Sequence, residues 1–168
     1  GLLEVLERFH VGGLLTTRFP SSTDLYDDWQ QAVEDSALAP ATAVRGEWID
    51  LGDGARLTVL NPAPETTLAG DRGLNDTSIV LRLSVGDVAI LLTGDITSQA
   101  EHALVKHGTD LNSTVLKVAH HGSKTSTSTE FLQRVQPVID VISAGKDTPF
   151  GHPAPEVIER LDGDAVFR

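Results

Sequence analysis

The sequence predicts an α/β fold in which helices cover β-sheets, organised as a single domain over residues 1–168. Two pairs of strand-like segments each flank a short turn that contains glycine, and the first pair alternates apolar and polar residues, which is typical of β-hairpins. The last third of the chain changes to a strand, helix, strand order, which is typical of α/β folds. With 168 residues and 40% hydrophobic side chains, the chain is long enough to bury one sizeable core.

The first quarter of the chain predicts a helix, a short strand and a second helix. Apolar residues recur at helical spacing over residues 2–9, and two glycines follow before the strand-like residues 14–17. Residues 22–24 (Ser-Thr-Asp) supply N-cap side chains for the second helix, which is expected to end before Pro40.

The middle of the chain predicts two hairpins with a long loop between them. The first hairpin joins residues 47–51 to 55–60, and the second joins residues 78–85 to 88–93. The last of these strands is apolar on both faces, so we expect it at the centre of a sheet. Residues 61–74 form the loop, which is rich in Pro, Thr, Gly and Asp, and loops of this length are commonly functional or disordered.

The C-terminal part predicts alternating helices and strands. Helices are expected over residues 98–107, 129–135 and 155–161, and strands over residues 115–118 and 138–142. The last helix begins with a proline, which suits the first helical turn because its missing N–H has no partner there.

Composition and charge exclude several classes of protein. The net charge of −11, from 13 basic and 24 acidic residues, argues against binding nucleic acid through a basic surface. The chain has no cysteine, which excludes disulfides, thiolate metal sites and a cysteine nucleophile. Its apolar runs are far shorter than the roughly 18 residues that span a bilayer, so we expect a soluble segment without membrane insertion.

Reactive residues follow three of the predicted strands, at the strand ends where α/β sheets bind their ligands. Asp95 follows the second hairpin, and His120 and His121 follow the next strand. His152 lies beyond the last strand, between a glycine and a proline. Imidazoles and carboxylates are common metal ligands, so one metal site is expected where these ends converge. The alternatives are that Asp95 caps the next helix, that the histidine pair is structural, and that His152 caps the helix from Pro155.

Two further polar segments allow two interpretations each. Asn75, Asp76 and Ser78 precede a strand, where they would reach a metal or substrate or else form an ordinary turn. Ser123 and Lys124 begin a hydroxyl-rich segment that suits a phosphate pocket or a solvated loop capping the next helix. The sequence has no nucleotide-binding glycine loop and no Gly-x-Ser-x-Gly elbow, so neither of those chemistries has support.

Four motifs in order resemble one known family. They are Asn75-Asp76-Thr77-Ser78 before an apolar strand, residues 92–95 (Leu-Thr-Gly-Asp), residues 116–126 around the histidine pair, and Gly151-His152-Pro153. Together they resemble the metallo-β-lactamase-like domain at the C-terminal end of the ComEC/Rec2 family, which forms the DNA-uptake channel of natural competence. The resemblance covers nearly the whole chain.

The resemblance implies a two-layer αββα sandwich with a two-metal hydrolytic centre that degrades the DNA strand that is not imported. It implies that Asp95 bridges the metals and that at least one of His120 and His121 is a ligand. The Asn-Asp-x-Ser residues match a signature near the site, and His152 matches the family's Gly-His-Pro histidine. The divalent ions would be Mn²⁺ or Zn²⁺, because both suit His and Asp ligands.

The sequence departs from the family in one major respect. The superfamily's His-x-His-x-Asp-His motif, which supplies ligands to both metals, is absent from these residues. In relatives that motif ends in Gly-Gly just before a helix like residues 2–9, so we expect Gly1 to be its last residue. The chain is then the C-terminal portion of the domain, expected to be inactive alone. Milder departures are Thr148 and Phe150, where relatives tend to have Asn and Tyr.

The function expected from the resemblance is a metal-dependent DNA phosphodiesterase, or nuclease, in a competence protein. Its parent would be a bacterial membrane protein whose channel portion and DNA are the partners, with this domain outside the cytoplasm. Bound cations would let an acidic domain act on DNA, since they bring positive charge to the phosphate. The alternatives are a metal-free module that guides DNA or packs against the channel, and a phosphorylcholine-esterase-like hydrolase of the same superfamily.

Overall fold

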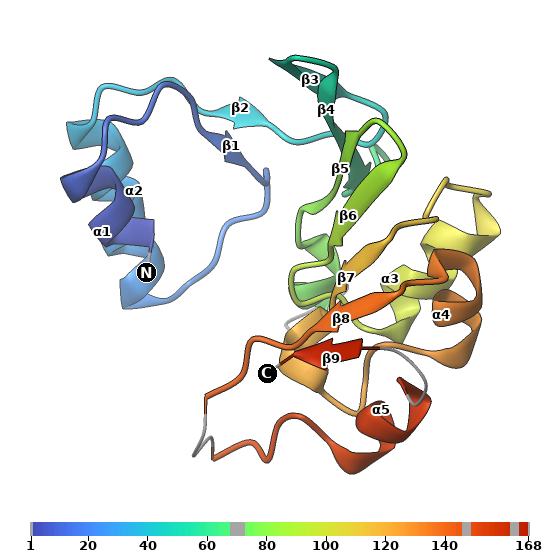
Figure 1. Ribbon diagram of the computed structural model, residues 1–168. Coiled ribbons are helices and arrows are strands. Elements are labelled where there is room, and N and C mark those ends of the chain that lie inside the picture. The colour runs from blue at the N-terminus through green and yellow to red at the C-terminus, as the bar shows by residue number, and fades with distance from the viewer. Residues whose placement is uncertain (1, 68–72, 146–148, 162–164, 168) are drawn as a thin grey trace. The chain divides into compact units, whose positions relative to one another are not determined.

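The computed structural model describes residues 2–67, 73–145, 149–161 and 165–167 (Figure 1). The chain divides into two compact units, Gly1–Ala43 and Val44–Arg168, and each unit is described by itself. The predicted α/β class is confirmed, because both units combine helices with strands.

The first unit pairs two short strands and two helices. Its elements are α1 (Leu2–Arg8), β1 (Leu15–Thr16), α2 (Asp24–Asp35) and β2 (Ala41–Thr42), and β1 pairs with β2 in parallel. The predicted N-cap is confirmed, since the Thr23 side chain accepts a hydrogen bond from the backbone N–H of Tyr26 at 3.3 Å. The helix ends at Asp35, earlier than predicted. The sequence also did not predict β2, because a two-residue strand has no periodicity.

The second unit is built on one seven-stranded sheet. Its strands are β3 (Trp48–Gly52), β4 (Ala55–Asn61), β5 (Val80–Val85), β6 (Val88–Leu92), β7 (Val115–Lys117), β8 (Ile139–Val141) and β9 (Ala165–Phe167), in that spatial order. Strands β3 to β6 are antiparallel neighbours, which confirms both predicted hairpins. Strands β6 to β9 run parallel, and β6 is the central strand as predicted. Strand β9 was not predicted.

Three helices lie on one side of this sheet. They are α3 (Ser98–Lys106), α4 (Thr129–Val135) and α5 (Pro155–Arg160), and they lie on the same side of the sheet in Figure 1. All three were predicted, α4 with the observed bounds. Two short 3₁₀ turns, η2 (Asn75–Thr77) and η3 (Ala119–Gly122), lie in the loops before β5 and after β7.

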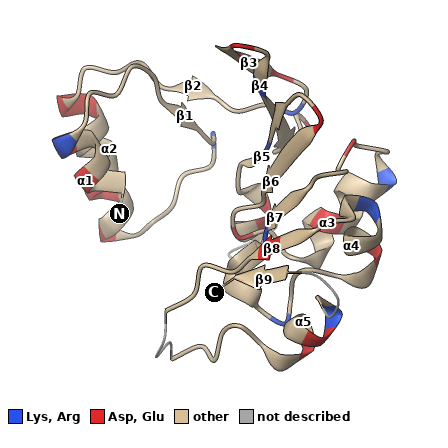
Figure 2. Ribbon diagram, viewed as in Figure 1, with Lys and Arg blue, Asp and Glu red and all other residues tan. Residues whose placement is uncertain are grey.

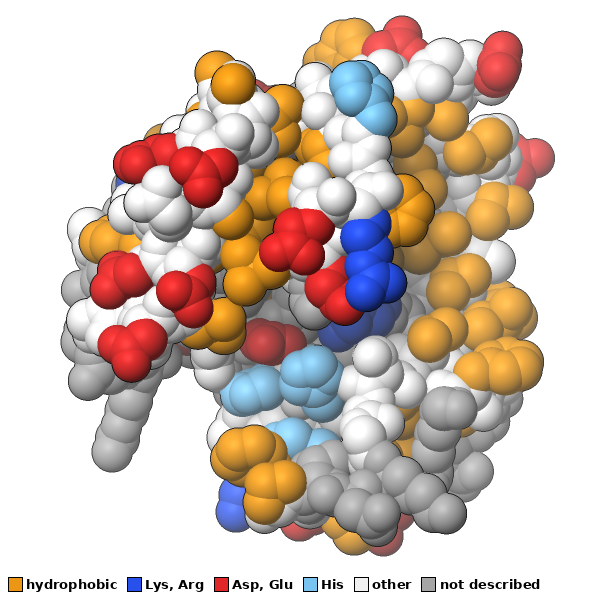
Figure 3. Space-filling model, turned by 90° about the vertical axis from the view of Figure 1, so that its left-hand side faces the viewer, with side chains coloured by type: hydrophobic (Ala, Val, Ile, Leu, Met, Phe, Trp, Pro, Cys, Tyr) orange, Lys and Arg blue, Asp and Glu red, His pale blue; other side chains and the backbone are white. Residues whose placement is uncertain are grey.

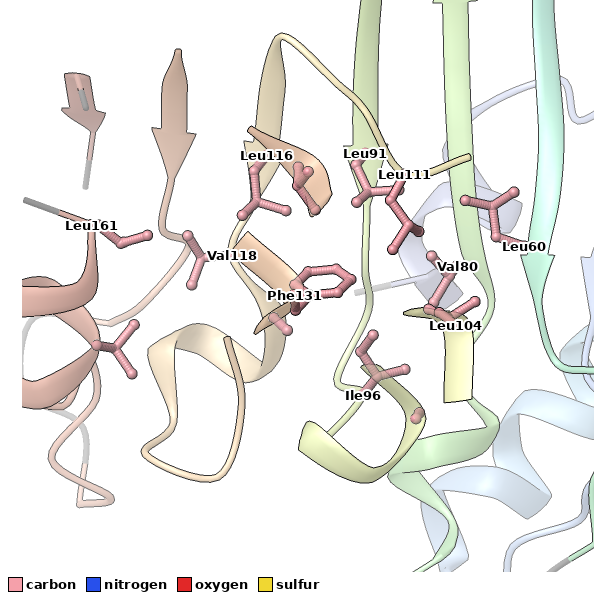
Figure 4. Packing of buried hydrophobic residues seen from close by; sticks show 14 of the residues in the cluster. Leu60, Val80, Leu91, Ile96, Leu104, Leu111, Leu116, Val118, Phe131 and Leu161 are labelled. Carbon is pink, nitrogen blue, oxygen red and sulfur yellow. The ribbon is translucent and has the colours of Figure 1, made fainter. Parts of the chain in front are cut away.

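The core of the second unit fills the space between the sheet and these helices (Figure 4). Leu91 and Leu116 point from β6 and β7 toward Leu104 of α3 and Phe131 of α4, and all four are fully buried. Burial of a side chain of this size contributes about 1.5–3 kcal/mol to stability. The helices are therefore fixed against the parallel half of the sheet.

The opposite face of the parallel strands is also apolar. Ile90 and Leu92 of β6 alternate with the buried Leu91, so they point to the other side of the sheet. Val141 of β8 and Phe167 of β9 continue this face and remain 37% and 58% exposed. Within the described part of the second unit, no helix covers this face (Figure 1).

A buried carboxylate ties α3 to the loop before α4. Glu101 has no exposed surface, and its two oxygens accept hydrogen bonds from the backbone N–H groups of Thr127 and Ser128. Burial raises the pKa of Glu101 above its ordinary value, and the two hydrogen bonds and the charge of Arg160 act against that rise. Arg160 of α5 donates to the carbonyls of Ser126 and Thr127. The loop is thus held from α3 and from α5.

We predict that Glu101→Gln lowers the free energy of unfolding by about 1–3 kcal/mol, because an amide has one acceptor oxygen and leaves one buried N–H facing an NH₂ group. Urea denaturation followed by circular dichroism measures the change. The control is Glu130→Gln, whose carboxylate is 56% exposed on α4 and pairs with His102. Equal stability of the two variants would show that the buried carboxylate does not hold the loop.

Candidate functional site

The loops that follow β6, β7 and β8 meet at the carboxyl edge of the parallel strands. Three hydrogen bonds join them and the segment before α5: His120 N–H to the Gly94 carbonyl at 3.1 Å, His121 Nδ1 to the Ser143 carbonyl at 2.6 Å, and Ala154 N–H to the Gly122 carbonyl at 2.8 Å. Residues up to 60 positions apart therefore form one site, as the strand-end argument expected. Figure 3 shows histidine side chains gathered on one face.

His121 is held in a defined tautomer. A carbonyl oxygen only accepts, so the 2.6 Å contact with Ser143 requires the hydrogen on Nδ1. In the neutral ring, Nε2 then carries a lone pair, and it lies 3.6 Å from Oδ1 of Asp95. Both side chains are about half exposed, at 47% and 44%. The Nδ1–H bond to a carbonyl is the outer contact that metal-ligating histidines commonly make, and it leaves Nε2 directed at Asp95.

The histidine pair has an unusual backbone. His120 and His121 both adopt left-handed conformations, with φ of 49° and 55°. For residues other than glycine this costs roughly 1–2 kcal/mol each. The His120 carbonyl accepts from Ser123 N–H at 2.9 Å, which helps to hold the turn. The result is that the two rings diverge, with centroids 6.5 Å apart and planes at 64°.

His120 turns toward His152, from the loop before α5. Their ring centroids are 5.9 Å apart. The Nδ1 atoms of both rings are buried and have no hydrogen-bond partner within the described chain. A buried nitrogen without a partner costs about 1–3 kcal/mol, so each calls for a water, an ion or a proton partner.

His152 does not cap α5. The N-cap residue of that helix is Ala154, which makes no side-chain cap hydrogen bond. The capping alternative for His152 is therefore wrong, and its ring contacts lie with His120 and with Phe150, whose ring stacks on it at 6.0 Å and 21°.

Asp95 is positioned by its neighbours and does not cap α3. The N-cap of α3 is Thr97, whose side chain accepts from Gln99 N–H, so the capping alternative for Asp95 is wrong. Ser78 accepts the backbone N–H of Asp95 at 3.2 Å. A Cβ on Gly94 would lie 2.8 Å from Cβ of Ser78, so only glycine allows this approach. Ser78 thus holds the backbone of Asp95 and leaves the Asp95 carboxylate available to the site.

The other two residues of the Asn75-Asp76-x-Ser78 motif have structural contacts. Oδ1 of Asp76 accepts both the backbone N–H and the hydroxyl of Thr97 at 2.8 Å, which joins η2 to the start of α3. Asn75 begins η2, and its carbonyl accepts the Ser78 N–H at 3.0 Å. The buried Asn61, which the sequence did not single out, donates to the carbonyls of Asp76 and Ser78. This is the turn that the sequence offered as the alternative.

The predicted phosphate-binding residues have different surroundings. Ser123 is 5% exposed, and its hydroxyl lies 3.0 Å from that of Thr125 inside the same loop. Lys124 is exposed. Ser128 at the end of the segment is the N-cap of α4 and accepts from Phe131 N–H, as the capping alternative expected.

Lys117 is a site residue that the sequence argument missed. It ends β7, and its Nζ donates to the Val118 carbonyl at 3.3 Å. Burial lowers the pKa of its ammonium group, and the charge of Asp95 acts to raise it. A lysine in a three-residue strand just before the histidine pair was the available signal. Elsewhere Lys and Arg are scattered over several elements (Figure 2).

The acid and histidine side chains form two pairs, Asp95 with His121 and His120 with His152. Within residues that the structure describes, no three His, Asp or Glu side chains lie close enough together to hold a metal ion. Catalytic zinc sites use three protein ligands.

The second unit is an α/β unit with acid and histidine side chains at the carboxyl edge of its sheet. Known proteins with similar sequences indicate the class of protein to which such a unit is related. No family model matches the chain. The chain is similar to ComE operon protein 3 of Bacillus subtilis, with 34% identity over 81% of the chain. It is 37% identical over 73% of its length to competence protein ComA of Neisseria gonorrhoeae, and 36% identical over 64% to recombination protein 2 of Haemophilus influenzae. The similarity to these relatives supports a relationship between this chain and the competence ComEC family.

The chain spans 17% of the length of the first two relatives and 13% of the third. Among the described helices, none has the length and apolar character needed to cross a membrane. Thr148, one of the two positions where the sequence departs from the family, lies outside the described residues.

We predict that Gly122→Ala costs more stability than Gly108→Ala. Both glycines have a left-handed backbone, with φ of +78° and +67°, so alanine costs roughly 1–2 kcal/mol at each. A Cβ at residue 122 would also lie 2.6 Å from Cβ of Pro153, whereas one at residue 108 meets nothing within 4 Å. Overpacking adds about 1–3 kcal/mol. Denaturant titrations measure the free energy of unfolding of both variants. Equal losses of stability would mean that the close contact between residue 122 and Pro153 does not contribute to stability.

Proposed function

We propose that this chain is part of a metal-dependent DNA phosphodiesterase in a competence DNA-uptake protein. The observation that carries the proposal is the His121 arrangement, in which Ser143 fixes the tautomer and Nε2 is directed at Asp95. This geometry supports the proposal, because metal-ligating histidines commonly donate their other N–H to a carbonyl or carboxylate. The similarity to competence proteins supplies the biological context.

Each residue of the site has a proposed role. Asp95 and His121 would be ligands, while Ser78 and Ser143 hold them in place. The remaining ligands would come from parts of the parent protein outside this chain. Bound divalent ions, Mn²⁺ or Zn²⁺, would supply positive charge for the phosphate and activate water. His152 would donate a proton to the leaving oxygen.

The fold proposed for the complete domain is the two-layer αββα sandwich of metallo-β-lactamase-like proteins. The sheet of the second unit supports it, because helices cover one face and an apolar face with exposed Val141 and Phe167 remains on the other. An apolar sheet face is stable in water only when a second layer buries it.

The acidic composition is compatible with DNA as substrate if the positive charge is local. The chain carries −11 overall, so a basic groove is not the source of affinity. The Lys117 ammonium beside the site and the bound cations would supply that charge. In the parent, a membrane protein, this domain would lie outside the cytoplasm next to the channel portion.

We predict that Asp95→Asn, in the complete parent protein, lowers metal-dependent cleavage of DNA by about 100-fold or more while leaving the fold intact. The amide keeps the shape of the side chain but loses the charge that a metal ligand needs. Cleavage of labelled single-stranded DNA with Mn²⁺ or Zn²⁺ measures the effect. Asp110→Asn is the control, since that carboxylate is 73% exposed and pairs with Arg82. Undiminished cleavage by Asp95→Asn would contradict the assignment.

We predict that His152→Ala in the complete protein lowers the cleavage rate about 10²–10⁴-fold with metal content retained, as expected for a proton donor. The rate and the bound metal are measured on the same preparation. Loss of metal would make His152 a ligand instead of a proton donor. A normal rate would leave it with neither role.

The second candidate function is a metal-free module that guides DNA. It is favoured by one observation, that no three ligand-type side chains in the described ranges gather at one point. The two candidates differ in metal content: a complete protein that binds DNA but holds no Mn²⁺ or Zn²⁺ after dialysis would be the guiding module.

A further inference from the structure

An exposed aromatic ring lies next to the candidate site but is not among the proposed metal ligands. Phe150 is 78% exposed, the highest value among the exposed large hydrophobic residues in the described ranges. Single exposed apolar residues are common and carry no argument by themselves. Phe150 differs because its ring stacks on His152 at a centroid distance of 6.0 Å and an angle of 21°.

This stack is fixed to the site by the chain around it. His152 lies against the ring of His120 at 5.9 Å. The next residue, Pro153, is packed so closely on Gly122 that no Cβ fits between them, and Ala154 donates to the Gly122 carbonyl. Hydrophobic atoms border the histidine cluster on the surface in Figure 3. Phe150 therefore presents a flat apolar face at the border of the site.

We propose that the Phe150 ring, backed by His152, is a stacking platform for a nucleobase of single-stranded DNA, an inference that rests on the proposed function. Every base has an aromatic face, so such a platform is independent of sequence. Stacking also needs no positive charge, which suits a chain with a net charge of −11. A duplex keeps its bases paired and stacked on each other, so the platform selects an unpaired strand.

Binding, measured separately from cleavage, tests the platform. Fluorescence anisotropy of the full chain in EDTA is measured with an oligothymidylate and with an abasic oligomer of the same length, which has the same phosphates without bases. Phe150→Ala and Phe150→Leu remove the aromatic face, and Leu retains most of the apolar volume. Phe150→Trp retains stacking. Trp48→Ala is the control, because Trp48 is also exposed but lies on β3 at the other edge of the sheet.

Phe150→Ala and Phe150→Leu are expected to weaken oligothymidylate binding by about 5- to 150-fold. Phe150→Trp and Trp48→Ala should bind it as the unchanged chain does, and no variant should alter binding of the abasic oligomer. Equal affinity of the unchanged chain for both oligomers, or no binding of either, overturns the platform. Equal loss for both oligomers in Phe150→Leu also overturns it. Base-dependent binding without cleavage by the complete protein supports the platform and contradicts the nuclease proposal alone.

Discussion

The close approach of loops at two glycines is the constraint on which the site depends. Gly94 brings the end of β6 against Ser78, and Gly122 brings the histidine turn against Pro153. Neither approach leaves room for a Cβ atom. Because glycine has no side chain, the two backbones can come close enough for hydrogen bonds between segments that are far apart in sequence. The reactive groups on these segments therefore lie at one edge of the sheet.

The strained histidine turn is supported from behind by a buried polar network. His120 and His121 adopt left-handed backbones that are unfavourable in isolation. The loop that follows them is held by Glu101 of α3 and Arg160 of α5, both bonded to its backbone. Burying a carboxylate is costly, and here its oxygens satisfy N–H groups that would otherwise be unpaired. The helix layer thus stabilises the conformation that the site requires.

The candidate site combines a small number of charged side chains with an exposed aromatic ring. Asp95 faces His121, and Lys117 adds one cation nearby, but the acid and histidine groups remain in two separate pairs. The proposed stacking face of Phe150 would add a contact with a nucleobase that does not depend on charge. For the proposed function, these features would place the contact with DNA at the site and not over a broad surface.

The sequence by itself determined the local elements, because they depend on short-range periodicity and on caps. Helix α4, both hairpins and the central position of β6 follow from residues within about ten positions of each other. The strand ends that carry Asp95, His120 and His121 could be located for the same reason. Only the tertiary structure decided which ring faces which partner: His121 toward Asp95, His120 toward His152. It also decided that Asp76 holds Thr97 and that Glu101 is buried, since these contacts join residues more than 20 positions apart, and no local pattern encodes a contact of that range.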